Sequence, residues 1–176
     1  VPLERGGKYP TFNMADERFF AKMRPGAFFF NSCRGEVMNK AAFIAAKRSG
    51  KIAGALIDVW PDEPDLDPEL TKLVELGTPH IAGYSYQGKQ NGTAASVQAV
   101  ARHFGISQLY DFYPEYDKSG HEPVLLDLKG KKQGEVAAVF QYNYPIFTDD
   151  FRFRMEPDNF ERMRSDYQYR REIYVE

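Results

Sequence analysis

The alternation of short apolar runs with amphipathic segments over the first hundred residues constrains the fold most strongly. Runs typical of strands occupy residues 27–31, 52–60 and 78–83. Between them lie segments whose apolar side chains recur at helical spacing. Strands that alternate with helices form βαβ units with a parallel sheet. We therefore predict that residues 1–105 form the later half of a doubly wound, Rossmann-like α/β domain.

Helices in this part of the chain are predicted from their start and stop signals. They are expected at residues 14–23, 36–50, 69–76 and 92–105. Pro25-Gly26 stops the first helix, and Gly50 and Gly105 are expected to cap two others. The run "AFFFN" (27–31) is continuously apolar, which predicts a strand covered on both faces.

A change of character near residue 106 predicts a second, small α+β domain over residues 106–176. We expect a strand at 124–130, helices at 135–142 and 157–172, and the start of another strand at 173. Its aromatic side chains have two interpretations, the core of this domain or a subunit interface. They are Tyr142, Tyr144, Phe147, Phe151 and Phe153.

Composition and charge exclude several classes of protein. The net charge is −2 with scattered Lys and Arg, which disfavours a nucleic-acid surface. No apolar run approaches the roughly 18 residues that a membrane span needs. A single cysteine, Cys33, excludes an intramolecular disulfide and fits a reducing cytoplasm. The chain starts without a signal pattern or an initiator Met, so we expect part of a longer protein.

Polar residues that follow the predicted strands are the candidates for chemistry. Arg34, Glu63 and His80 each come just after an apolar run. The carboxyl ends of parallel strands share one edge of a sheet, so these side chains are expected to converge there. Arginine suits a carboxylate, and a Glu–His pair suits proton transfer near neutral pH. The pattern indicates proton transfer on a substrate that carries a carboxylate.

The other polar features of the sequence are also explained by ordinary structural roles. Residues 83–89 give G-x-x-x-x-G-K, but Gln90 stands where a phosphate-binding loop needs Ser or Thr. Lys89 is either a solvated lysine at a helix start or a ligand of a substrate phosphate. His103 is predicted to cap a helix end, and His121 to lie in an exposed turn. No spacing of His, Cys and Asp indicates a metal site.

Three motifs resemble one family. "NSCRGEV", "LIDVWPDEP" and "GTPHIAGY" are similar, in order and rough spacing, to motifs of the D-isomer-specific 2-hydroxyacid dehydrogenases. The similarity covers residues 1–105 and continues more weakly into "FERMRSDYQYRREIYV", which resembles part of a C-terminal dimerisation domain in one subgroup. The resemblance implies NAD as cofactor, a phosphorylated 2-hydroxy acid as substrate, and a homodimer.

The resemblance also implies roles for individual residues. Arg34, Glu63 and His80 match the catalytic residues, with Glu63 as the partner of His80. Tyr84, together with Arg34, matches a substrate-binding position. The positions that match the cofactor-binding residues are Val1, Ser32, Cys33, Arg34, Asp58 and Gly83.

The sequence departs from the family pattern at its start. The fingerprint G-x-G-x-x-G is absent, and so are the acidic residue expected beyond it and the N-terminal substrate lobe. Asn39 replaces the usual Asp, which should matter for the start of a helix rather than for chemistry. We therefore expect this chain alone to bind NAD poorly and to be inactive.

Three hypotheses follow for the complete protein. The first is an NAD-dependent dehydrogenase of a phosphorylated 2-hydroxy acid. The second is a dehydrogenase of another, unphosphorylated D-2-hydroxy acid. The third is a non-enzymatic, NAD-sensing binding module of the same fold.

Overall fold

The computed structural model describes residues 1–115, 120 and 122–175, which form two compact units. The first unit consists of Val1–Ala82 and Ile146–Asp166, and the second of Gly83–Pro145 and Tyr167–Glu176. The predicted boundary between residues 105 and 106 therefore falls inside the second unit. The division into domains 1–105 and 106–176 stays a prediction. His121 lies outside the described residues.

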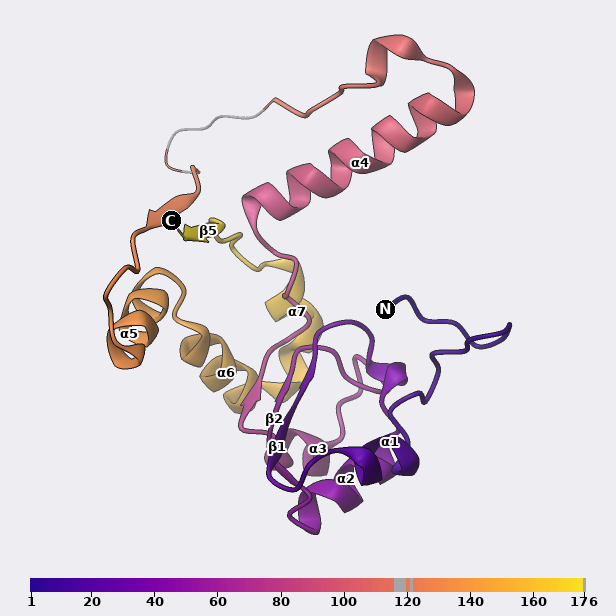
Figure 1. Ribbon diagram of the computed structural model, residues 1–176, viewed down its shortest axis with the longest axis vertical. Coiled ribbons are helices and arrows are strands. Elements are labelled where there is room, and N and C mark those ends of the chain that lie inside the picture. Colours follow the sequence, from indigo (N-terminus) through magenta and orange to yellow (C-terminus); the bar gives the residue numbers. More distant parts are fainter. Residues whose placement is uncertain (116–119, 121, 176) are drawn as a thin grey trace. The chain divides into compact units, whose positions relative to one another are not determined.

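A parallel three-stranded sheet forms the centre of the first unit (Figure 1). Its strands, in spatial order, are β1 (Ala27–Asn31), β2 (Ile52–Ile57) and β3 (Leu76–Gly77). Asn31 pairs with Ile57, and Ile57 pairs with Gly77, so the carboxyl ends of all three strands lie at one edge. This arrangement confirms the predicted α/β fold with a parallel sheet.

The described residues of the first unit form five helices. They are α1 (Glu17–Lys22), α2 (Lys40–Arg48), α3 (Pro68–Leu73), α6 (Ile146–Met155) and α7 (Phe160–Ser165), with 3-10 turns at Gly35–Val37 and Pro157–Asn159. The side chains of Asp16, Asn39 and Asp67 accept backbone N–H bonds as N-caps. Asn39 accepts from Ala42 N–H at 2.9 Å, which confirms its predicted role at a helix start.

One helix prediction in the C-terminal part was wrong, and one helix was not predicted. No element was predicted at α6, whose aromatic residues show no clear helical stripe and in which only Asp149 and Phe153 are buried. The helix predicted over 157–172 is split into a 3-10 turn and the short α7. It ends at Ser165, and residue 170 instead pairs with the backbone near Ser85 in the second unit.

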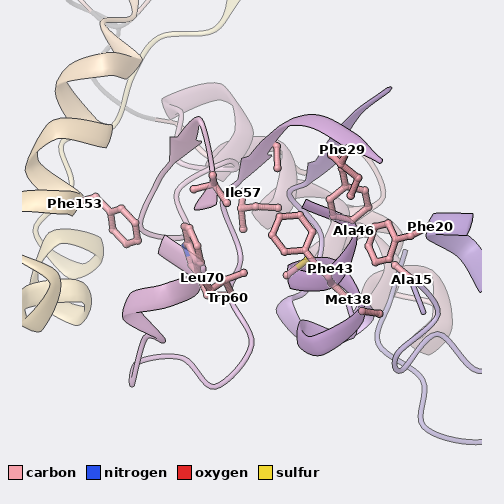
Figure 2. Close-up of a cluster of buried hydrophobic side chains, with 14 of the residues drawn as sticks. Ala15, Phe20, Phe29, Met38, Phe43, Ala46, Ile57, Trp60, Leu70 and Phe153 are labelled. Carbon is pink, nitrogen blue, oxygen red and sulfur yellow. The ribbon is translucent and has the colours of Figure 1, made fainter. Parts of the chain in front are cut away.

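The core of the first unit is aromatic (Figure 2). Phe20 of α1, Phe29 of β1 and Phe43 of α2 pack with ring centroids 5.3 to 6.1 Å apart. Edge-to-face and tilted contacts of this kind add to the stabilisation from burial. A second part of the core brings Trp60 and Phe153 together, with their rings stacked at 5.0 Å.

The opposite face of β1 is open, which corrects the prediction of a strand covered on both faces. Phe28 and Phe30 are 58% and 66% exposed, because α1 and α2 pack against Phe29 on the other face. The Phe28 ring lies over Gly54, where a Cβ would approach it to 2.3 Å. Gly54 therefore leaves room for the ring on the neighbouring strand.

The second unit contains α4 (Tyr86–Phe104), α5 (Gln133–Asn143), the 3-10 turn Ser107–Leu109, and the parallel strands β4 (Val124–Leu126) and β5 (Ile173–Val175). Helix α4 begins at Tyr86 rather than at residue 92, because Ser85 caps it by accepting from Gly88 N–H at 2.9 Å. Gly105 ends it with φ of 70°, as predicted.

The C-terminal aromatic residues do not share one role. Phe153 is 1% exposed and belongs to the core of the first unit, so it is not part of a separate small core. Tyr142 is 89% exposed, and Phe147 and Phe151 are each 62% exposed. A subunit interface stays a prediction for these exposed rings.

Glu75 joins α2 to the sheet. Its carboxylate lies 2.7 Å from Lys47 Nζ and accepts from Ala55 N–H at 2.5 Å. Burial acts to raise the pKa of Glu75, but the bonds from Lys47 and Ala55 outweigh it, so the pKa is lowered from 4.5.

Replacing Glu75 by Gln should therefore weaken the dependence of stability on acid pH. The lowered pKa makes the carboxylate stabilising above pH 4.5, and this contribution is lost as the pH falls through the folded-state value. Between about pH 6 and about pH 3, we expect the wild type to lose less than about 1 kcal/mol more unfolding free energy than the variant, since the pair is solvent-screened. Urea unfolding across this range measures it. Identical pH dependence in wild type and Glu75→Gln would contradict the assignment.

Candidate active site

The segments that follow the three strands begin side by side. Asp58 N–H donates to the Asn31 carbonyl at 2.9 Å, and Thr78 N–H donates to the Ile57 carbonyl at 3.0 Å. The chain therefore leaves β1, β2 and β3 at the same edge of the sheet. This is the edge at which open parallel sheets bind their ligands.

Asp58 organises the turn that follows β3. Its carboxylate is buried, with the residue 7% exposed. It accepts from Thr78 Oγ1 at 2.7 Å, from Ile81 N–H at 2.8 Å and from Ala82 N–H at 3.0 Å. These bonds draw residues 78–82 around the carboxylate instead of along β2, so the strand predicted over 78–83 is wrong.

His80 lies at the apex of this turn. Its φ of 57° is in the left-handed region, which is uncommon for a residue with a side chain. The Asp58 carbonyl accepts from His80 N–H at 2.8 Å and holds this conformation. The turn keeps the imidazole partly accessible, with its side chain 21% exposed.

The structure brings His80 and Glu63 together. His80 Nδ1 lies 2.8 Å from Glu63 Oε2, and Glu63 Oε1 accepts from Trp60 N–H at 2.6 Å. A carboxylate only accepts hydrogen bonds, so the ring donates from Nδ1 and leaves Nε2 as an acceptor. The arrangement is that of a general base whose tautomer is fixed by a carboxylate.

The loop that carries Glu63 is pinned by Lys40 at the start of α2. Lys40 Nζ lies 3.0 Å from Asp62 Oδ2 and 3.2 Å from Asp67 Oδ2. Hydrogen bonding to Asp62, and then to Asp67, raises the pKa of Lys40. Asp67 also caps α3 through the Glu69 N–H, and this bond is the main cause of its lowered pKa. The loop is thus held to α2 through Asp62 and to α3 through Asp67.

Arg34 is placed by close backbone packing. Gly35 lies against the Trp60–Pro61 peptide, where a Cβ would come within 2.0 Å of the Trp60 carbonyl oxygen, so only glycine fits. The exposed Arg34 side chain donates from Nη1 to the Cys33 carbonyl at 2.7 Å. Among the described residues it bonds to neither Glu63 nor His80. Its guanidinium therefore keeps donors for another group.

Asn31 shapes the turn between β1 and Arg34. Its side chain accepts from Cys33 N–H at 3.2 Å and donates to the Arg34 carbonyl at 3.0 Å. Ser32 is exposed within this turn, and Cys33 is half-buried. The backbone at these two positions lies at the edge where a cofactor is expected.

For three predicted site residues, Val1, Gly83 and Tyr84, no described contact bears on the predicted role. Val1 is 62% exposed at the start of the first unit, whereas Gly83 and Tyr84 open the second unit. In the second unit, Lys89 Nζ lies 3.7 Å from the centroid of the Tyr84 ring, a cation–π contact. The predicted roles of all of them in binding stay predictions.

Sequence reasoning missed the residues that support the pair. Trp60, Thr78 and Lys40 were not singled out for this role, because each acts through contacts that only the fold creates. The sequence marks Thr78 only weakly, because its role depends on a hydrogen bond to the buried Asp58, twenty residues away. Between residues 1 and 175, in the parts that the structure describes, no cluster of His, Cys, Asp and Glu could hold a metal ion. No described helix is both long and apolar enough to span a bilayer.

The chain is similar in sequence to known proteins of one family. Residues 8–82 match the NAD-binding domain of the D-isomer specific 2-hydroxyacid dehydrogenases. The chain is 41% identical over 172 residues to the erythronate-4-phosphate dehydrogenase of Bacteroides fragilis, which covers 98% of this chain and 47% of that protein. It is 36% identical over 190 residues to the enzyme of the same name from Cellvibrio japonicus, covering 99% and 49%.

The chain spans about half the length of these curated relatives. Among solved structures, it is similar to the holo form of Rhodotorula graminis D-mandelate dehydrogenase, with 37% identity and a TM-score of 0.44 over 50% of this chain and 25% of that one.

The bond between Thr78 and Asp58 can be tested by replacing Thr78 with Val. Valine keeps the shape of the side chain but removes the donor to a buried carboxylate, so we expect a loss of about 1–3 kcal/mol in the free energy of unfolding. Thr78→Ser keeps the hydroxyl and should lose less. Urea unfolding of the chain measures both. A Val variant as stable as the wild type would show that the bond does not hold the turn.

Proposed function

Because residues 8–82 belong to the NAD-binding domain family of the D-isomer specific 2-hydroxyacid dehydrogenases, we propose that the full-length protein is an NAD-dependent dehydrogenase of a D-2-hydroxy acid. The finer proposal is the oxidation of 4-phospho-D-erythronate to its 2-oxo acid, a step in the synthesis of pyridoxal phosphate. The observation that carries the proposal is the contact of 2.8 Å between His80 and Glu63 at the carboxyl edge of the sheet.

The residues at this edge fit the nicotinamide half of NAD. Asp58 Oδ2 accepts one described bond, from Ala82 N–H, so the carboxylate retains capacity for one donor of a carboxamide. The backbone of Ser32 and Cys33 would line the cofactor on the side of β1, and we propose the same for Val1 and Gly83. NAD, when bound, accepts a hydride from the carbon that carries the hydroxyl group.

The side chains of this chain would bind the substrate and move its proton. In the proposed mechanism, His80 Nε2 accepts the hydroxyl proton, and Glu63 stabilises the imidazolium that results. Arg34 offers a planar set of donors to the substrate carboxylate, and Tyr84 contacts the substrate. In the reverse direction, the same imidazolium returns the proton to the carbonyl oxygen.

Cellular setting and assembly are part of the proposal. The single cysteine supports a cytoplasmic location. Exposed aromatic residues of the C-terminal part, such as Tyr142 and Phe147, support a homodimer, for which two-fold symmetry is the default.

Turnover of erythronate 4-phosphate by the full-length protein tests the function. His80→Gln should lower kcat/KM by roughly 100-fold to 10,000-fold, because it removes the general base. His103→Gln, in the last turn of α4, is the matched control and should leave turnover unchanged. Equal turnover of unphosphorylated erythronate would favour the dehydrogenase of another hydroxy acid. NAD binding without any turnover would favour the NAD-sensing module.

NAD binding by the 176-residue chain is a separate test. The chain contains no G-x-G-x-x-G sequence to hold the pyrophosphate. We therefore expect a dissociation constant of about 1 mM or weaker by calorimetry. Tight binding of NADH to this chain would overturn the expectation.

A further inference from the structure

We propose that α6 positions the His80–Glu63 pair through three of its residues, Asp150, Phe153 and Arg154. The catalytic consequence rests on the proposed function, but the positioning itself does not. The three residues lie in the first unit together with the pair, although more than sixty residues separate them in the sequence. They are positioning residues, because no contact described for them in the structure reaches His80 or Glu63.

Asp150 holds the end of β3. Its Oδ1 atom accepts from Gly77 N–H at 2.6 Å, and its side chain is 15% exposed. Gly77 is the last residue of the strand, and Thr78, Pro79 and His80 follow it directly. The point from which the histidine turn leaves the sheet is therefore bonded to α6.

Arg154 bonds Asp150 to the end of α3. Its Nε atom donates to both oxygens of Asp150, at 3.0 and 2.9 Å. Its Nη1 and Nη2 atoms donate to the carbonyls of Thr71 and Val74, at 2.8 and 3.0 Å. Those carbonyls end α3, where helices lack internal partners. One guanidinium thus ties α3 and α6 together beside β3.

Phe153 stacks on Trp60 within the core of the first unit. Its ring is 1% exposed and stacks on Trp60 with centroids 5.0 Å apart and planes inclined by 25°. Phe153 projects from α6 into the same cluster as Trp60 and Leu70 (Figure 2). A Cβ on Gly77 would come within 2.9 Å of both rings, so glycine is needed where they meet the strand.

Trp60 connects this support to both members of the pair. Its indole Nε1–H donates to the Thr78 carbonyl at 2.9 Å, two residues before His80. Its backbone N–H donates to Glu63 Oε1 at 2.6 Å. A shift of Trp60 would therefore displace the carboxylate and the histidine turn at once. Residues that only fill a core would change stability without this specific effect.

The test reads the pair directly in this chain, by ¹⁵N NMR of the imidazole and without NAD or substrate. The Nδ1–H resonance of His80 is assigned by its disappearance in His80→Gln. Phe153→Leu keeps an apolar side chain but removes the stack on Trp60. We expect it to lose the hydrogen-bonded Nδ1–H resonance while the fold is retained. Phe151→Leu, 62% exposed on the same helix, is the matched control and should keep the resonance.

If Phe153→Leu does not fold, the same resonance is measured in two further variants, Asp150→Asn and Arg154→Lys. Each keeps part of the bonding and removes the bidentate pair. We expect both to weaken the same resonance, whereas the exposed control Asp158→Asn should not. A wild-type Nδ1–H resonance in every folded α6 variant would overturn the proposal.

Kinetics of the full-length protein separate this proposal from the proposed function. A misplaced base should lower kcat by about 100-fold in Phe153→Leu, with KM for the hydroxy acid much less affected. If the resonance responds but the wild-type protein oxidises no hydroxy acid, the positioning stands and the proposed function fails. If turnover is normal in Phe153→Leu, the positioning role fails while the proposed function stands.

Discussion

The buried carboxylate of Asp58 is the constraint on which the site depends. A charge in this position must be satisfied by donors, because burying it unpaired would cost several kcal/mol. The turn of residues 78–82 supplies them from a hydroxyl group and two backbone N–H groups. The chain therefore stops following the sheet after Gly77. His80 takes up a left-handed conformation at the place where the three strands end.

Glu63 reaches His80 because its loop is fixed on several sides. Lys40 holds the acidic residues around it, and Trp60 bonds one oxygen of the carboxylate. The other oxygen is left for the imidazole. The geometry of the pair therefore depends on packing and on hydrogen bonds from residues that take no part in proton transfer. This rigid support is what a general base near neutral pH requires.

The sequence predicted the parallel sheet and the meeting of Glu63 with His80, because apolar periodicity and the ends of strands are local signals. It failed where the structure depends on distant partners. The strand expected at 78–83 gave way to bonds with Asp58, and α6 had no strong apolar stripe of its own. Phe28 and Phe30 belong to a continuous apolar run, yet only the packing of helices decides which face is covered.

A crystal structure of the full-length protein with NAD and 4-phospho-D-erythronate would test the account most directly. The account predicts His80 Nε2 within about 3 Å of the oxygen on the reacting carbon, with Nδ1 still bonded to Glu63. The nicotinamide ring would lie beside the carboxyl ends of β1 and β2. A substrate whose hydroxyl group is bound by another residue, with His80 turned away from it, would contradict the account.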